Sequence, residues 1–224
     1  MTFSIVARCT STGLFGVAVA SSSPAVASRC AHVRAGVGAV ASQNVTDPSL
    51  GHKALDLLGQ GASAAETVGI MRRNNAHMDY RQLLVVDGTG GSAIHSGANA
   101  LGVWAEAKSE NVACGGNLLA SPKVPGAMVE SFLSSSGPLG DRLILAMQAA
   151  LAAGGEAGPV HSAGMMLVDK VAWPVADLRV DWTEACPVGE LAALWRRYKP
   201  QLDAYVTRAL DPTAAPSYGV PGDP

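Results

Sequence analysis

The sequence predicts an α+β protein, a four-layer αββα sandwich in which two antiparallel sheets pack face to face between outer helices. Strand patterns alternate with helical patterns in the order strands, helix pair, strands, helix pair, strands, helix. The links between strands are short and rich in glycine, which favours hairpins and therefore antiparallel pairing. A Rossmann-type fold is not expected, because no G-x-G-x-x-G motif follows a strand and opens a helix.

Short apolar runs mark the strands. The first two flank residues 9–13, and another two flank residues 87–91, where Asp-Gly and Gly-Gly supply turn conformations. Each pair is therefore predicted to form a hairpin. The predicted strands cover residues 2–8, 14–22, 32–34, 36–43, 83–86, 92–95, 103–106, 111–114, 164–168 and 176–181.

Apolar residues recur at helical spacing between the blocks of strands. Ser63 and Glu66 have the spacing of a capping box, and Gly154-Gly155 ends another helical run. The predicted helices cover residues 50–58, 63–74, 123–134, 138–153 and 187–210. Residues 1–211 are expected to form a single domain, followed by a mobile tail rich in Pro, Gly and Ala at 212–224.

The composition excludes several classes of partner. The 224 residues carry a net charge of -2 without a run of Lys or Arg, so neither nucleic acid nor a membrane surface is an expected partner. Hydrophobic residues make up 48% and charged residues only 15%, which leads us to expect a homo-oligomer. The cysteines form no CxxC pair or Cys/His cluster, so no metal and no other cofactor is expected.

Residues 12–28 superficially resemble a signal peptide, with an apolar run followed by small residues. Arg8 and the polar residues 9–13 interrupt this pattern, and no basic segment precedes it. No stretch approaches the ~20 apolar residues needed to cross a bilayer. The sequence therefore predicts a cytoplasmic protein with free thiols.

Thr2 is the principal candidate nucleophile, because a strand pattern begins with this residue directly after Met1. If Met1 is removed, as a small second residue permits, the hydroxyl and a free α-amine belong to the same residue. An α-amine titrates near ~7.7–8.0, so its neutral form can accept the hydroxyl proton near physiological pH. Thr also favours strands, and plain β-propensity is the alternative explanation.

Several strings, in order, resemble the DUF1028 family, a group assigned to the N-terminal nucleophile (Ntn) hydrolase fold. They are TFSIVAR at 2–8, GVAVASSS at 16–23, RAGVGAVASQN at 34–44, GGNLLA at 115–120 and DLRVD at 177–181. The resemblance extends to about Arg197. It implies the αββα sandwich and hydrolysis of a C–N amide bond in a small-molecule substrate through Thr2.

Residues 16–22 are also similar to the second strand of threonine-type hydrolases such as proteasome β subunits, with the pattern GVxVAxD. Ser22 stands where that pattern has its acid. Those enzymes use a lysine on the following strand, whereas the first lysine here is Lys53. Arg34 is therefore the preferred cation, ahead of Arg29 and His32. An arginine can stabilise an oxyanion but stays protonated.

The oxyanion donors are expected at two strand ends. Ser42, Gln43 and Asn44 would offer backbone N–H groups and side-chain amides, and Asn117 is the second candidate amide. The alternatives are that Gln43 and Asn44 cap the turn at Asp47, and that Asn117 belongs to an ordinary Gly-Gly-Asn turn.

Other polar residues have structural interpretations. Asp177, Arg179 and Asp181 alternate along a strand and are expected to form a salt-bridged, solvated face. His95 and His161 are expected to be structural. A non-catalytic αββα protein that binds a small ligand or acts as an oligomeric scaffold remains the competing hypothesis, because the acid and the lysine are missing.

Overall fold

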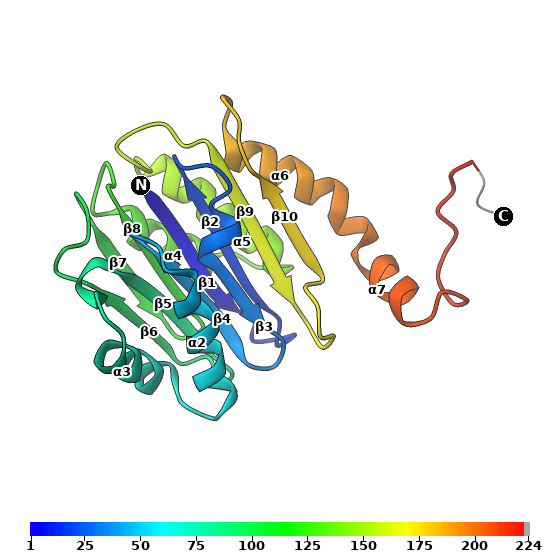
Figure 1. Ribbon diagram of the computed structural model, residues 1–224. Helices are drawn as coiled ribbons and strands as arrows, with labels where there is room; N and C mark the ends of the chain where they lie inside the picture. The colour runs from blue at the N-terminus through cyan, green and yellow to red at the C-terminus, as the bar shows by residue number, and fades with distance from the viewer. Residues whose placement is uncertain (222–224) are drawn as a thin grey trace.

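The computed structural model describes residues 1–221 and contains two antiparallel sheets (Figure 1). The six-stranded sheet consists, in spatial order, of β10 (Ala176–Val180), β9 (Ser162–Val168), β2 (Phe15–Ser21), β1 (Thr2–Arg8), β8 (Val112–Asn117) and β7 (Ala105–Ser109). The four-stranded sheet consists of β3 (Ala31–Arg34), β4 (Gly38–Gln43), β5 (Gln82–Asp87) and β6 (Ser92–Ser96). β1 therefore lies inside its sheet, hydrogen-bonded on both sides.

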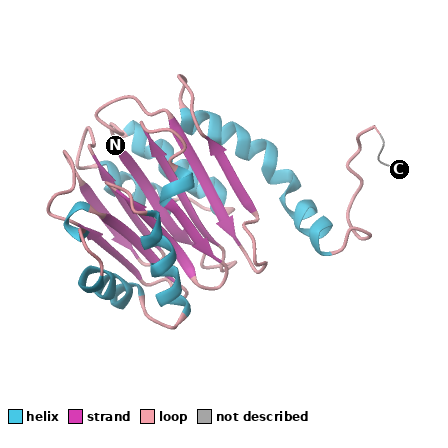
Figure 2. Ribbon diagram, in the orientation of Figure 1, coloured by secondary structure: helices cyan, strands magenta, loops and turns pink. Residues whose placement is uncertain are grey.

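Helices cover the outer face of each sheet, as Figure 2 shows. α2 (Pro48–Gly59) and α3 (Ala64–Asn74) pack on the four-stranded sheet. α4 (Val124–Ser134), α5 (Leu139–Ala152) and α6 (Pro187–Tyr198) pack on the six-stranded sheet. The short α1 (Ala27–Cys30) and a 3-10 turn, η1 (Met78–Tyr80), precede β3 and β5.

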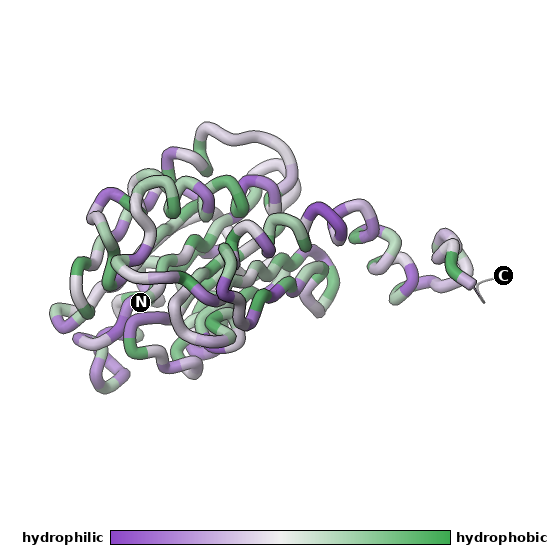
Figure 3. Tube along the Cα trace, turned by 90° about the horizontal axis from the view of Figure 1, so that it is seen from above, coloured by the Kyte–Doolittle hydropathy of each residue, from purple (hydrophilic) through white to green (hydrophobic). Residues whose placement is uncertain are grey.

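Alternation along the strands explains the layers, because successive side chains point to opposite faces. Phe3 and Ile5 of β1 belong to the core beneath α4 and α5, whereas Val6 packs with Leu84 and Val86 of the facing sheet. A third apolar cluster lies between the four-stranded sheet and its helices. Figure 3 shows hydrophobic segments concentrated inside these layers. The predicted four-layer αββα sandwich is confirmed.

The prediction of one continuous helix over residues 187–210 is wrong. α6 ends at Tyr198, a 3-10 turn follows at η2 (Lys199–Gln201), and a separate helix, α7 (Leu202–Leu210), comes after it. Pro200 lies in this turn, where it lacks the N–H that a continuous helix needs. α7 has no buried residue and extends away from the sandwich (Figures 1 and 3).

Residues 211–221 beyond α7 form no helix or strand. The end of the predicted tail, residues 222–224, lies outside the described residues. Within residues 1–221, no helix combines the length and apolarity required to span a membrane.

β8 is longer than the sequence pattern predicts. It continues through Gly115 and Gly116 to Asn117, with these glycines opposite Ser4 and Phe3 of β1. A Cβ at Gly116 would lie 2.6 Å from the Leu119 side chain, so this close packing requires glycine. Asn117 is therefore the last residue of a central strand, and the alternative of an ordinary Gly-Gly-Asn turn does not hold.

Candidate functional site

Several strands begin or end at the edge of the sandwich where β1 starts, here called the N-terminal edge. Thr2 pairs with Asn117 at the end of β8, and Ser21 at the end of β2 pairs with Ser162 at the start of β9. In the other sheet, Gln43 at the end of β4 pairs with Gln82 at the start of β5. The antiparallel topology thus gathers polar residues from both sheets around Thr2.

Thr2 is almost completely buried at the N-terminal edge. Its Oγ1 donates to the Met1 carbonyl oxygen at 2.5 Å, and Ser21 Oγ donates to the same oxygen at 2.5 Å. The two hydroxyl oxygens are 3.4 Å apart. Ser21 in turn contacts Ser23, with 2.9 Å between the hydroxyl oxygens, and Arg29 donates to Ser23 Oγ at 3.1 Å. A serine pair therefore connects Thr2 to a guanidinium.

Glu156 supplies a buried carboxyl group at this edge. It lies between α5 and β9 and is only 6% exposed, and its Oε2 accepts a hydrogen bond from Ser22 N at 3.2 Å. Its Oε1 is buried and has no hydrogen-bond partner within the described chain. Burial raises the pKa of Glu156 to about 7, although the positive N-terminus and the Ser22 N–H oppose this shift.

The positive charge of the N-terminus acts to lower the pKa values of both the Glu156 carboxyl and the Cys30 thiol of α1, against the burial that raises them. Burial raises the pKa of the Cys30 thiol, against the opposing effects of the Thr46 hydroxyl, Arg29 and the N-terminal charge. Cys30 Sγ lies 3.4 Å from Thr46 Oγ1 in the segment after β4. The Met1 side chain lies over the segment after Glu156, since a Cβ at Gly158 would be 3.0 Å from Met1 Cε.

Amide side chains connect the two sheets beneath Thr2. Ser4 Oγ donates to Gln43 Oε1 at 2.6 Å, and Gln43 Nε2 donates to Gln82 Oε1 at 3.2 Å. Asn117 Nδ2 donates to the same Gln82 oxygen at 3.0 Å. Thr2 and Asn117 are directly opposite in adjacent strands, so their side chains share the face turned toward this network.

Asn44 and Val45 form a strained turn after β4. Both have positive φ angles, 61° and 58°, and a β-branched residue such as Val45 rarely adopts this conformation. Asn44 Oδ1 accepts from Leu101 N at 3.2 Å, whereas the buried Asn44 Nδ2 has no partner within residues 1–221. The Val45 carbonyl accepts a hydrogen bond from Arg81. The turn thus holds an unused amide donor at the N-terminal edge.

The structure brings Thr2, Ser22, Gln43, Asn44 and Asn117 to one edge. Ser22 contributes its backbone N–H to Glu156. Gln43 and Asn44 do not cap the turn at Asp47, because Asp47 itself caps α2 through Ser49 N.

Ser42 and Arg34 make contacts elsewhere. Ser42 Oγ donates to the Asp47 carbonyl at 2.9 Å. Arg34 lies at the other end of the β3–β4 pair and forms a salt bridge with Asp56 at 2.7 Å. Its guanidinium also donates to the Leu55 carbonyl. The structure therefore does not bring Arg34 to Thr2, and Arg29 is the cation connected to it.

The remaining polar candidates have structural contacts. His95 Nε2 lies 2.9 Å from the Met78 carbonyl, and His161 stacks on Trp182. Arg179 of β10 pairs at 3.0 Å with Asp181, directly after that strand. All four cysteines are free thiols. Among the residues that the structure describes, no group of three or more His, Cys, Asp or Glu side chains is arranged to hold a metal ion.

Sequence reasoning missed Glu156, Ser21 and Gln82. Glu156 follows Gly154-Gly155 at a helix end, where an acid normally signals an exposed loop. For Ser21 the sequence does hold a signal. Val17 and Val19 lie on the inner face of β2, and alternation along the strand places Ser21 on the same face. Gln82 carries no signal beyond its position just before an apolar strand.

The fold and the site together define an αββα-sandwich protein whose first strand begins with a buried threonine. The family model described as "Family of unknown function (DUF1028)" matches residues 2–191. The chain belongs to the DUF1028 family, which confirms the resemblance in the sequence. No curated protein matches it.

Solved structures are consistent with this assignment. The crystal structure of protein SPO2555 from Silicibacter pomeroyi, described as a DUF1028 protein, matches with 29% identity and a TM-score of 0.82, covering 88% of this chain and 89% of that chain. Anbu (ancestral beta-subunit) from Yersinia bercovieri matches with 14% identity and a TM-score of 0.39, covering 91% of this chain and 97% of that chain. The second likeness is too weak to support an argument.

Proposed function

We propose that the protein is an Ntn-type hydrolase that cleaves a C–N amide bond in a small molecule, with Thr2 as nucleophile after removal of Met1. The observation that carries this proposal is that Thr2 is buried at an edge where the Ser21 hydroxyl contacts the Met1 carbonyl and the buried Glu156 carboxyl contacts the neighbouring Ser22 N–H. If Thr2 served only to favour the strand, neither the Ser21 hydroxyl nor the buried Glu156 carboxyl would be needed beside it.

In the proposed reaction, the Thr2 hydroxyl attacks the substrate carbonyl and its proton moves to the Thr2 amine. The amine leaving group departs with a proton, and water then hydrolyses the ester on Thr2. Met1 O is two bonds from the Thr2 nitrogen, so Ser21, 2.5 Å from that oxygen, is positioned to contact the free amine. Ser21 would thereby orient the base toward the hydroxyl.

Glu156 has a role that follows from its surroundings. Above a pH of about 7 its carboxylate is ionised, and the negative charge stabilises the ammonium that forms when the amine takes the hydroxyl proton. This carboxylate contacts the backbone of Ser22, the position where the related strand pattern has an acid. Glu156 therefore compensates for the acid missing at Ser22.

Asn117 and Asn44 are the proposed oxyanion donors. Asn117 uses one N–H of its amide on Gln82, which fixes the side chain and leaves a second N–H next to Thr2. Asn44 Nδ2 is buried without a partner in the described chain, so a substrate oxygen would satisfy it. Gln43 has a supporting role, because its amide is held between Ser4 and Gln82.

The test begins with the intact mass of the protein purified from its native host, which is expected to lack Met1. The processed protein is then screened against small amides and N-carbamoyl compounds. Thr2→Ala is expected to abolish turnover, Thr2→Ser to retain part of it, and Thr10→Ala to leave it unchanged. Thr10 is a matched control because it lies exposed in the turn at the other end of β1.

A non-catalytic ligand-binding or scaffold protein is the alternative. This alternative is favoured if Met1 persists in the native host. The α-amine then belongs to methionine, and the Thr2 hydroxyl stays hydrogen-bonded to the Met1 carbonyl. Turnover that survives Thr2→Ala in the processed protein would also exclude the proposed mechanism.

A further inference from the structure

Exposed apolar side chains gather on the segments around the N-terminal edge. They come from the turn after β4, from η1 before β5, from the β6–β7 link and from the segment after β10. The side chains are between 39% and 53% exposed and are Val45, Tyr80, Leu101, Val103, Trp104 and Trp182. We call this set the apolar rim.

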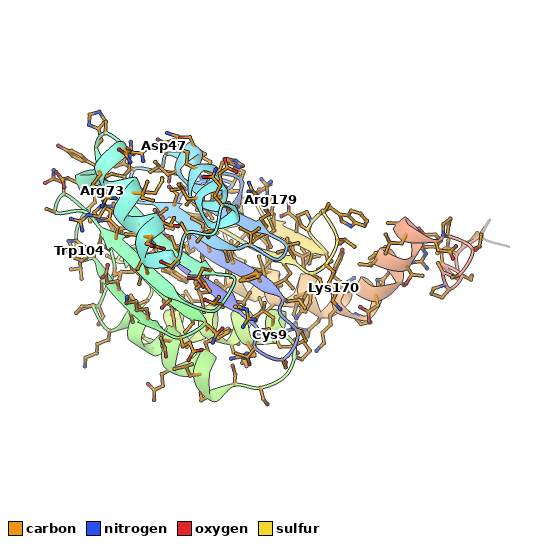
Figure 4. All side chains as sticks on the ribbon, turned by 90° about the horizontal axis from the view of Figure 1, so that it is seen from below. Cys9, Asp47, Arg73, Trp104, Lys170 and Arg179 are labelled. Atoms are coloured by element: carbon orange, nitrogen blue, oxygen red, sulfur yellow. The ribbon has the colours of Figure 1, made fainter. Side chains whose placement is uncertain are left out.

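The opposite edge is different. Among residues 1–221, the turns there expose one large hydrophobic side chain, Trp173 in the β9–β10 turn. Figure 4 shows Trp104 at the left of the sandwich and Cys9, just after the far end of β1, toward its lower right. Since exposed apolar residues otherwise occur singly on a protein surface, the three that lie close together in the β6–β7 link, Leu101, Val103 and Trp104, indicate a binding surface.

The apolar rim is connected directly to the candidate site. Leu101 N donates to Asn44 Oδ1, and the Leu101 and Val103 carbonyls accept from Leu118 N and Leu119 N, immediately after Asn117. The segment that carries these apolar side chains is therefore fixed to the two proposed oxyanion donors. Asn44 is only 5% exposed, and its Nδ2, without a partner in the described chain, lies in the same contact region.

We infer that the apolar rim binds a large apolar group of the substrate, so that the protein acts on amides with a long alkyl or aromatic acyl group. This inference rests on the proposed function. An amide carbonyl satisfies the Asn44 donor while its acyl group covers Leu101 and Val103. Burying apolar surface that is already exposed favours binding, and each additional methylene adds to it.

The experiment compares primary amides that all release ammonia: acetamide, hexanamide and phenylacetamide. The processed protein is expected to show kcat/KM at least tenfold higher for hexanamide and phenylacetamide than for acetamide. Leu101→Ser and Val103→Ser are expected to reduce this preference, the ratio of kcat/KM for hexanamide to kcat/KM for acetamide, severalfold. Trp173→Ser, a similarly exposed apolar residue at the opposite edge, is the matched control and is expected to change nothing.

A binding measurement separates this inference from the proposed function. The Thr2→Ala protein, titrated calorimetrically, is expected to bind hexanamide at least tenfold more tightly than acetamide. If it does so while the wild type hydrolyses nothing, the apolar site stands and the hydrolase proposal fails. Equal turnover of the three amides through Thr2 would overturn the inference alone. A change of oligomeric state in Leu101→Ser, without a change in amide preference, would also overturn it and identify the rim as a subunit interface.

Discussion

Glu156→Gln should stabilise the protein at high pH and leave its stability unchanged at low pH. The substitution keeps the shape of the side chain and an oxygen for Ser22 N, but removes the buried carboxylate. Burial raises the pKa of Glu156 to about 7, from an ordinary value of 4.5. The native state therefore binds more protons than the unfolded state between these two values.

This difference fixes the sign and the size of the effect. Because the native state binds more protons, the free energy of unfolding of the wild type falls as pH rises from about 4.5 to about 7, and then levels off. At 1.36 kcal/mol for each pKa unit, the full decrease is about 3 kcal/mol. The glutamine side chain of the variant does not titrate, so the variant is expected to exceed the wild type by up to about 3 kcal/mol at pH 8.

Urea unfolding at pH 4, 5, 6, 7 and 8 measures this directly, with free energies taken from linear extrapolation. Glu110→Gln, in the exposed turn between β7 and β8, is the matched control and should follow the wild-type pH dependence. A stability difference between Glu156→Gln and wild type that stays constant from pH 4 to pH 8 would refute the assignment of a buried, destabilised carboxylate.

Further predictions concern the core and the far edge. Burial raises the pKa of Asp87, but hydrogen bonds from Ala64, Thr89 and Gly91 outweigh it and hold that pKa below its ordinary value. Asp87→Asn should therefore lower the free energy of unfolding by about 1–3 kcal/mol at pH 7, and this deficit should shrink as pH falls through about 4, as urea unfolding would show. Trp195→Ala should lower the free energy of unfolding by about 3–5 kcal/mol, because the buried ring packs on Gly140 and its N–H donates to Asp141 at 2.8 Å. Leu210→Ala on α7 should change the free energy of unfolding by no more than about 0.5 kcal/mol, because Leu210 is 64% exposed.

The layers of the fold could be predicted because their signals are local. Gly-rich turns located the hairpins, and helical periodicity located the covering helices, so the αββα order followed from short-range patterns. Pro200 lies where the helix breaks, yet the amphipathic pattern continues on both sides of this proline and predicts one helix. The extension of β8 through Gly115 and Gly116 depended on β1 and Leu119, whose packing no strand pattern reveals.

The candidate site was predicted only in part, because it is assembled by strand pairing. Thr2 and Asn117 could be named from strand ends, and the structure places them opposite each other. Arg34 was chosen for its position on the next strand, but it points away to Asp56 at the other end of that strand. Glu156 reaches Ser22 across 134 positions of sequence, a contact that no local pattern encodes.

The central claim, that Thr2 is a nucleophile, is tested most directly by mapping a covalent acyl adduct. The protein purified from its native host would be treated with an acylating electrophile such as a β-lactone, digested and analysed by tandem mass spectrometry. The expected result is one adduct per chain, on the hydroxyl of an N-terminal Thr2, lost in Thr2→Ala and retained in Thr10→Ala. An unmodified Thr2 in chains that lack Met1, or an adduct at another residue only, would contradict the claim.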